Sequence, residues 1–70
     1  MILVFKTSVN TKKKVKSLSP FLNNLLQISH WNFDLDDCDY ILRVESQINV
    51  SEQIIRLLND KGFECTELDD

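Results

Sequence analysis

Three consecutive lysines, Lys12, Lys13 and Lys14, stand where a helix can begin. Asn10 or Thr11 can cap that helix, because either side-chain oxygen can accept from backbone N–H groups two or three residues further on. A helix N-terminus carries partial positive charge and free N–H donors, so it attracts anions, and lysines strengthen that attraction. The run therefore predicts one of two things. It is either a binding site, for phosphate or for the acidic surface of another protein, or a solvated loop that holds no ligand.

Two thiols, Cys38 and Cys65, are the residues that could bind a soft metal ion. The single histidine, His30, is interpreted as a surface or capping residue, and it is disfavoured as a partner of Cys38 because the two lie at opposite ends of one predicted strand. No second histidine exists to complete a histidine site. In a chain of this type we expect both thiols to be reduced and each cysteine to pack as a small apolar side chain.

Four aspartates at positions 34, 36, 37 and 39 resemble a calcium-binding loop in composition. The loop lacks the glycine that such sites require at their sixth position, so we interpret the aspartates as a hydrated turn. No nucleophile stands beside a base, and no pair of carboxylates is predicted to face a cleft. We expect neither enzymatic activity nor a cofactor.

The whole chain has 70 residues, which predicts one domain spanning residues 1–70. Its net charge of −3 hides an asymmetry, because residues 1–33 carry five lysines and no acid, whereas residues 34–70 carry eleven acids and three basic residues. The halves either neutralise each other or offer one half to a partner. The acidic total argues against nucleic acid, and the longest apolar run, Met1 to Phe5, is too short to cross a membrane. We expect a cytoplasmic protein.

The hydrophobic pattern predicts six elements that would position these residues. Ile2–Lys6 reads as a buried strand, and a helix follows with Val15, Leu18, Leu22 and Leu25 on one face. Pro20 predicts a kink in that helix, or a new start capped by Ser19. Two alternating strands, 31–35 and 40–45, form a hairpin around residues 36–39. Ser51 is expected to cap a second helix that ends at Gly62, and residues 63–68 make a last strand.

The predicted order βαββαβ is that of a ferredoxin-like α+β fold, an antiparallel sheet of strand order 4-1-3-2 with both helices on one face. Three connections then gather at one end of the sheet: residues 7–11, residues 36–39 and the turn at Lys61 and Gly62. Cys38 and Cys65 lie toward opposite edges, roughly 10 Å or more apart. That separation exceeds the Cα distance of about 7 Å that a disulfide tolerates, so we expect neither a bridge nor a shared metal ion within one chain.

Several segments in register give the chain a resemblance to the heavy-metal-associated domain family, which includes small copper chaperones and the N-terminal modules of copper-transporting ATPases. The segments are FKTSVN (5–10), PFLNNL (20–25), ISHW (28–31), ILRVES (41–46) and SEQIIRLLNDKGFE (51–64). The resemblance implies the same fold and a metal loop after the first strand. In metal-binding members two cysteines occupy the loop positions that are Thr11 and Lys14 in this chain.

A hydroxyl and an ammonium do not replace two thiolates as ligands for Cu(I), so the resemblance implies a degenerate site that holds no metal. Val9 matches a position at which relatives bury a methionine, and Lys61 matches a lysine that lies near the metal in some chaperones. We therefore predict a non-enzymatic protein-interaction module with an acidic partner. Two alternatives stay open: anion binding at Lys12, Lys13, Lys14 and Lys61, and Cu(I) or Zn(II) binding through Cys38 or Cys65 at an interface between two chains.

Overall fold

The computed structural model of the chain describes residues 1–68 and contains six elements in the predicted order. The strands are β1 (Ile2–Thr7), β2 (Ile28–Asp34), β3 (Ile41–Ser46) and β4 (Cys65–Glu67), and the helices are α1 (Lys12–Asn23) and α2 (Ser51–Asp60). All strand pairs are antiparallel and the order across the sheet is β2-β3-β1-β4. This is the expected order 4-1-3-2 read from the other edge, and the predicted fold is confirmed.

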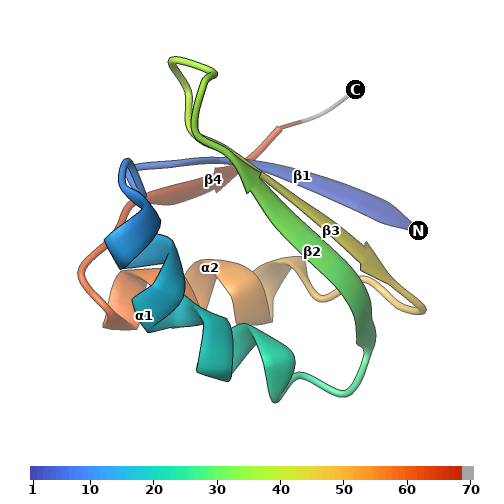
Figure 1. Ribbon diagram of the computed structural model, residues 1–70. Coiled ribbons are helices and arrows are strands. Elements are labelled where there is room, and N and C mark those ends of the chain that lie inside the picture. The colour runs from blue at the N-terminus through green and yellow to red at the C-terminus, as the bar shows by residue number, and fades with distance from the viewer. Residues whose placement is uncertain (69–70) are drawn as a thin grey trace.

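Both helices cover the same face of the sheet, and the turn between β2 and β3 projects on the opposite side (Figure 1). The core fills the space between sheet and helices. Its fully buried side chains come from β1, α1, β3 and α2: Phe5, Leu18, Leu22, Leu42, Val44, Ile54 and Leu58, with Val9 and Val50 from the loops. These positions follow a period of two in the strands and of three to four in the helices, so the pattern that predicted the elements also predicts which side chains they bury.

At Pro20 the structure excludes one of the two predicted alternatives, a new helix start. The helix runs without a break from Lys12 to Asn23, with Pro20 inside it, so Ser19 does not cap a new helix. Proline lacks the N–H that would bond to the carbonyl of Lys16, but its position on the exposed side of the helix leaves that carbonyl open to water. Leu18 and Leu22, which are fully buried, hold the helix on the sheet across the missing bond.

Helix α2 begins at Ser51, so Ser51 is not its cap, contrary to the prediction. The capping residue is Val50, which has no side-chain oxygen, and the amide oxygen of Asn49 instead accepts the Ser51 N–H at 2.9 Å. The predicted end of the helix is confirmed, because Gly62 has a φ of +88°. Residues other than glycine adopt this left-handed backbone conformation only with strain.

Several strand boundaries also differ from those predicted. β2 begins at Ile28, three residues earlier than its alternating aromatic residues indicate, and β4 covers only Cys65–Glu67 of the expected 63–68. Tyr40 is not part of β3; it has a φ of +48° and closes the turn before the strand. None of the helices in residues 1–68 is long and apolar enough to span a membrane.

Candidate functional site at the lysine-rich end

Thr11 and Lys14, the two positions that relatives fill with cysteine, build the start of helix α1. Thr11 has an extended backbone, with φ −137° and ψ 154°, and its hydroxyl accepts the Lys14 N–H at 3.1 Å. The Lys14 ammonium in turn donates to the Asn10 side-chain oxygen at 2.8 Å. The sequence left Asn10 and Thr11 as alternative caps, and the structure selects Thr11. These residues thus stabilise a helix N-terminus through hydrogen bonds.

The loop before α1 is tied to both of its neighbours. Toward the β2–β3 turn, the Thr7 hydroxyl donates to the Tyr40 carbonyl at 2.7 Å and the Thr7 N–H to the Asp39 carbonyl at 3.2 Å. Toward the α2–β4 connection, the Ser8 N–H donates to the Glu64 carbonyl, and the Glu64 N–H donates to the Ser8 hydroxyl at 2.8 Å. The prediction that three connections share this end of the sheet is confirmed by these bonds.

Val9 anchors the middle of the loop. Its side chain is fully buried, and its N–H donates to the Thr7 hydroxyl at 3.2 Å. Because both Val9 and Thr7 are inaccessible to water, the loop cannot rotate without opening the core. The lysines that follow therefore start from a fixed backbone.

The lysines of α1 are exposed, and Lys12 lines a hollow beside β2 together with Asp34 and Asp36. Within residues 1–68, no carboxylate lies in ion-pair contact with Lys12, Lys13, Lys14 or Lys16. The two ion pairs of this part of the chain are Lys6 with Asp39 at 3.5 Å and Arg43 with Asp34 at 3.9 Å. Only the first joins the basic half to the acidic half. The acidic half of the chain therefore does not pair with the lysines in the first turn of α1. This turn remains a positive surface, at the end where the helix dipole is also positive.

Lys61 has a partner of its own. Its ammonium lies 3.8 Å from the centre of the Phe21 ring, a cation–π contact with the far part of α1. The sequence grouped Lys61 with the lysine run, but this contact directs its charge to an aromatic ring. The candidate site at this end is therefore the surface of Lys12, Lys13, Lys14 and Lys16, which we call the lysine surface.

Both cysteines are free thiols, as expected, but only Cys65 packs as a small apolar side chain; that expectation is wrong for Cys38, which is exposed. Cys65 is buried, and burial first, then the negative charge of Glu67, raises its pKa from 9.0 to about 12. Such a thiol gives up its proton less readily than an exposed one, so Cys65 is the poorer metal ligand of the two cysteines. Cys38 is exposed in the β2–β3 turn, where Asp37 and Asp39 bring one ligand atom each within 4.8 Å of its sulfur and of one another.

The Asp37–Asp39 cluster already has a structural explanation. The Asp37 carboxylate accepts the Asp39 N–H at 2.9 Å, which closes the turn, and Asp39 pairs with Lys6. All three side chains face solvent, fully or in part. The cluster thus matches the hydrated turn that the sequence predicts.

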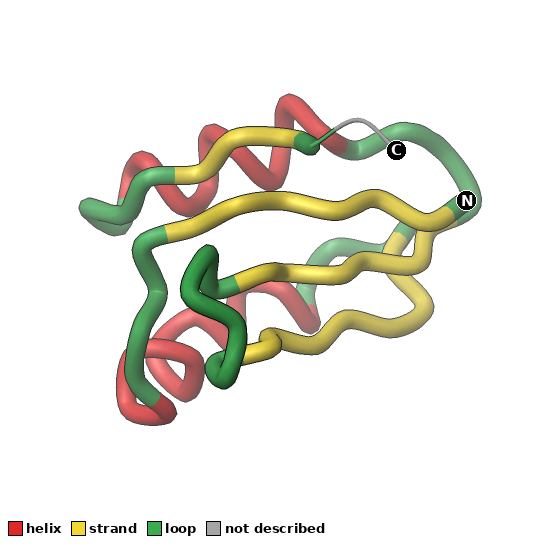
Figure 2. Tube along the Cα trace, turned by 90° about the horizontal axis from the view of Figure 1, so that it is seen from above, coloured by secondary structure: helices red, strands yellow, loops and turns green. Residues whose placement is uncertain are grey.

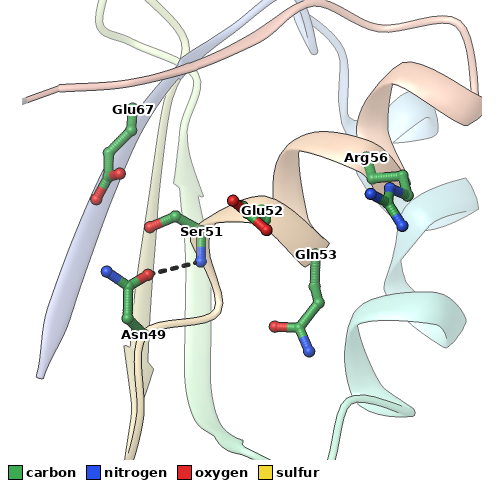
Figure 3. Close-up of a pocket in the computed structure, with 6 residues that line it drawn as sticks. All are labelled: Asn49, Ser51, Glu52, Gln53, Arg56 and Glu67. Carbon is green, nitrogen blue, oxygen red and sulfur yellow. Dashed lines mark hydrogen bonds between the residues drawn. The ribbon is translucent and has the colours of Figure 1, made fainter.

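A polar hollow of about 580 Å³ lies beside the N-terminus of α2, and sequence reasoning did not find it (Figure 3). Glu52, Gln53 and Arg56 line it from the helix, Asn49 from the preceding loop and Glu67 from β4. The Ser51 hydroxyl points between Asn49 and Glu67 and has no hydrogen-bond partner. That oxygen is fully covered by protein atoms, so a molecule in the hollow could not touch it without a rearrangement.

Compared with models of known protein families, the chain matches none of them. No curated protein matches it significantly either.

Proposed function

We propose that this chain is a non-enzymatic interaction module that binds an acidic protein surface through the lysine surface at the N-terminus of α1. The observation that carries the proposal is that three exposed lysines, Lys12, Lys13 and Lys14, stand in the first turn of α1, and Lys16 follows one residue after that turn. No carboxylate of residues 1–68 forms an ion pair with any of them. Like charges gathered at the positive end of a helix destabilise it, which is a cost that a partner would offset. An acidic partner would gain both the lysine charges and the field of the helix.

The rigid loop supports this reading. A docking surface binds more tightly when its backbone is already ordered, because less conformational entropy is lost on association. Val9 and Thr7 are buried, and hydrogen bonds tie the loop on both sides, so the lysine side chains are the only part that must become ordered.

We also infer that the chain is a diverged member of the heavy-metal-associated family whose metal loop has become a protein-binding surface. Its strand order and the loop after β1 are consistent with that ancestry, and Thr11 and Lys14 now serve helix capping at the positions of the ligands. We place the function in the cytoplasm, where both free thiols would stay reduced.

The test is a titration with an acidic probe, a peptide of ten glutamates, followed by amide chemical shifts in 20 mM salt. We expect the largest shifts at residues 10–16 and a loss of affinity of at least about tenfold when Lys12, Lys13 and Lys14 are changed together to Gln. A matched control changes three other exposed basic residues, Lys6, Arg43 and Arg56, to Gln, which removes the same net charge. Equal loss in both variants, or no binding by the wild type, would contradict the proposal.

Two further arms separate the alternative functions. Inorganic phosphate at millimolar concentration that shifts the same amides, without any response to the peptide, would indicate a small-anion site. Stoichiometric Cu(I) or Zn(II) binding that disappears in a Cys38→Ser variant would indicate metal binding between chains, since Cys65 is the poorer metal ligand of the two cysteines.

A further inference from the structure

Strand β2 forms one outer edge of the sheet, with β3 on its inner side only (Figure 2). It has seven residues, whereas β4 at the other edge has three. No strand of residues 1–68 pairs with its outer side. The register with β3 shifts between Ile28 and His30, and beyond this irregularity, from His30 to Asp34, the edge presents a regular row of free backbone donors and acceptors. Such a row is a template for pairing with another strand.

The helix-side face of β2 is aromatic. Trp31 and Phe33 lie opposite the core residues Val44 and Leu42 of β3, and their rings meet edge to face with centres 6.0 Å apart. Both remain partly exposed. Beside them a groove of about 300 Å³ runs between the strand and the start of α1, lined by Lys12, Val15, Trp31, Asn32, Phe33 and Leu35. This groove is mainly apolar at its base and lies directly along the free edge.

The opposite face of β2 is polar and carries an imidazole at one end and a carboxylate, which also pairs with Arg43 of β3, at the other. His30 and Asp34 stand there with Asn32 between them, opposite Glu45, Ile41 and Arg43 of β3. His30 is the only basic side chain of the strand and Asp34 the only acidic one. Their spacing about Asn32 is symmetrical, so the strand is complementary to itself when it is reversed.

A second copy paired antiparallel about Asn32 places every residue i opposite residue 64 − i of the partner. His30 then faces Asp34 of the other copy twice, and Trp31 faces Phe33 twice on the helix side. Each indole stays beside its own α1, because its N–H donates to the Asn23 side-chain oxygen at 2.9 Å. A pairing about Trp31 would put Asp34 opposite Ile28, and one about Phe33 would put His30 opposite a residue beyond the strand. An imidazole that can donate to a facing carboxylate, and aromatic rings directly across two strands, both favour pairing.

We propose that two copies of this chain associate through β2, antiparallel about a two-fold axis at Asn32, to form one continuous eight-stranded sheet. The axis is perpendicular to the sheet, so the helices of both copies lie on the same side. The interface is isologous, and the same patch serves both partners. It is a different surface from the first turn of α1, apart from Lys12 at the rim of the groove, and the dimer does not depend on the function proposed for the lysines.

The test is a charge exchange measured by sedimentation equilibrium over a range of concentrations up to millimolar. We expect the wild type and a His30→Lys variant to dimerise, and His30→Asp to raise the dimer dissociation constant by at least about tenfold, because two acidic pairs then face each other. Adding Asp34→Lys to His30→Asp restores opposite charges and should bring the constant back to within about threefold of the wild type. Thr66→Asp adds a charge on the opposite edge, β4, and serves as the matched control.

Each result decides the proposal. A wild type that remains a monomer at millimolar concentration overturns it, and so does a dimer that responds equally to His30→Asp and Thr66→Asp, or one that the second substitution does not restore. Circular dichroism of every variant shows whether the monomer is still folded. A folded His30→Asp monomer whose double variant dimerises again supports the register at Asn32.

Discussion

At the scale of single residues, the two thiols show how position decides chemistry. Cys65 lies on β4 opposite Thr7, with a relative exposure of 8%, whereas Cys38 lies in an exposed turn. Both have the same side chain, but only the exposed one is available to solvent, reagents or metal ions. The sequence predicted two free thiols and could not rank them, because the burial of Cys65 depends on helix α2 packing over a strand of only three residues.

The buried thiol makes stability depend on alkaline pH. The pKa of Cys65 is raised from 9.0 to about 12 in the folded chain, so between these values the unfolded chain has lost a proton that the folded chain keeps. Its contribution to stability is therefore complete below pH 9 and declines as pH rises from 9 to 12. We expect the urea midpoint of the wild type to fall more steeply over this range than that of Cys65→Ala.

Lysine and tyrosine titrations are common to both chains and cancel in that comparison. Parallel midpoint curves for the two proteins would show that the thiol does not contribute. Alkylation offers an independent check at pH 8, since iodoacetamide reacts with thiolates. Peptide mass spectrometry should find Cys38 modified well before Cys65 in the folded chain, and both at similar rates in urea.

At the scale of elements, helix α1 combines a good cap with unfavourable charges. Its first turn contains no acid, although acidic residues there would interact well with the helix dipole. Changing Lys12 and Lys13 together to Glu should therefore stabilise the fold, by about 0.5 kcal/mol per substitution at low salt. Urea unfolding at 20 mM and at 1 M NaCl measures this gain, which should largely disappear at high salt.

The control variant changes Lys16 and Lys61 to Glu. Lys16 lies after the first turn of α1 and Lys61 after the end of α2, so this variant tests whether the gain in stability belongs to the N-terminus of α1. They change the net charge equally but should give no comparable increase. A decrease in stability of the Lys12 and Lys13 variant would mean that the lysines are structural. A gain would show that these residues cost stability, in keeping with a role in binding.

Much of each element could be predicted from local residue types, and the misses have local causes. Thr11 and Gly62 serve as the sequence indicates, because a cap needs a side-chain oxygen and a left-handed residue favours glycine. The prediction that Ser51 caps α2 was wrong, because Ser51 is already the first residue of the helix and its own N–H donates to the side-chain oxygen of Asn49. Pro20 broke no helix, since buried leucines on the other side of α1 hold it in place.

The candidate site was predictable in part. Charge runs are visible in a sequence, so the lysines of α1 were found, and their exposure agrees with that prediction. The partner of Lys61 was not predictable, because Phe21 lies forty residues away and meets it only through the packing of α1 against α2. The hollow beside Ser51 and the groove beside Trp31 likewise depend on elements brought together by the fold.

At the scale of the whole molecule, every element contributes to one core, which should make unfolding a single cooperative transition. The cluster of buried side chains joins β1, α1, β3, α2 and β4, and Trp31 and Phe33 of β2 pack against it. Leu58 of α2 is fully buried, so Leu58→Ala should cost about 2–5 kcal/mol through lost contacts and a cavity. Because the core is shared, this change should lower the stability of β2 as well.

Two spectroscopic signals report separately on the β2 edge and on the helices that share the core. Fluorescence of Trp31, the single tryptophan, reports on β2, and far-ultraviolet circular dichroism reports mainly on the helices. In urea we expect both signals to share one midpoint in the wild type, and to share a lower one in Leu58→Ala. Leu26→Ala is the control, since Leu26 is 93% exposed and its removal should leave both midpoints unchanged. If Leu58→Ala moved the dichroism midpoint alone, helix α2 would unfold independently of the β2 edge, and the single core would not act as one unit.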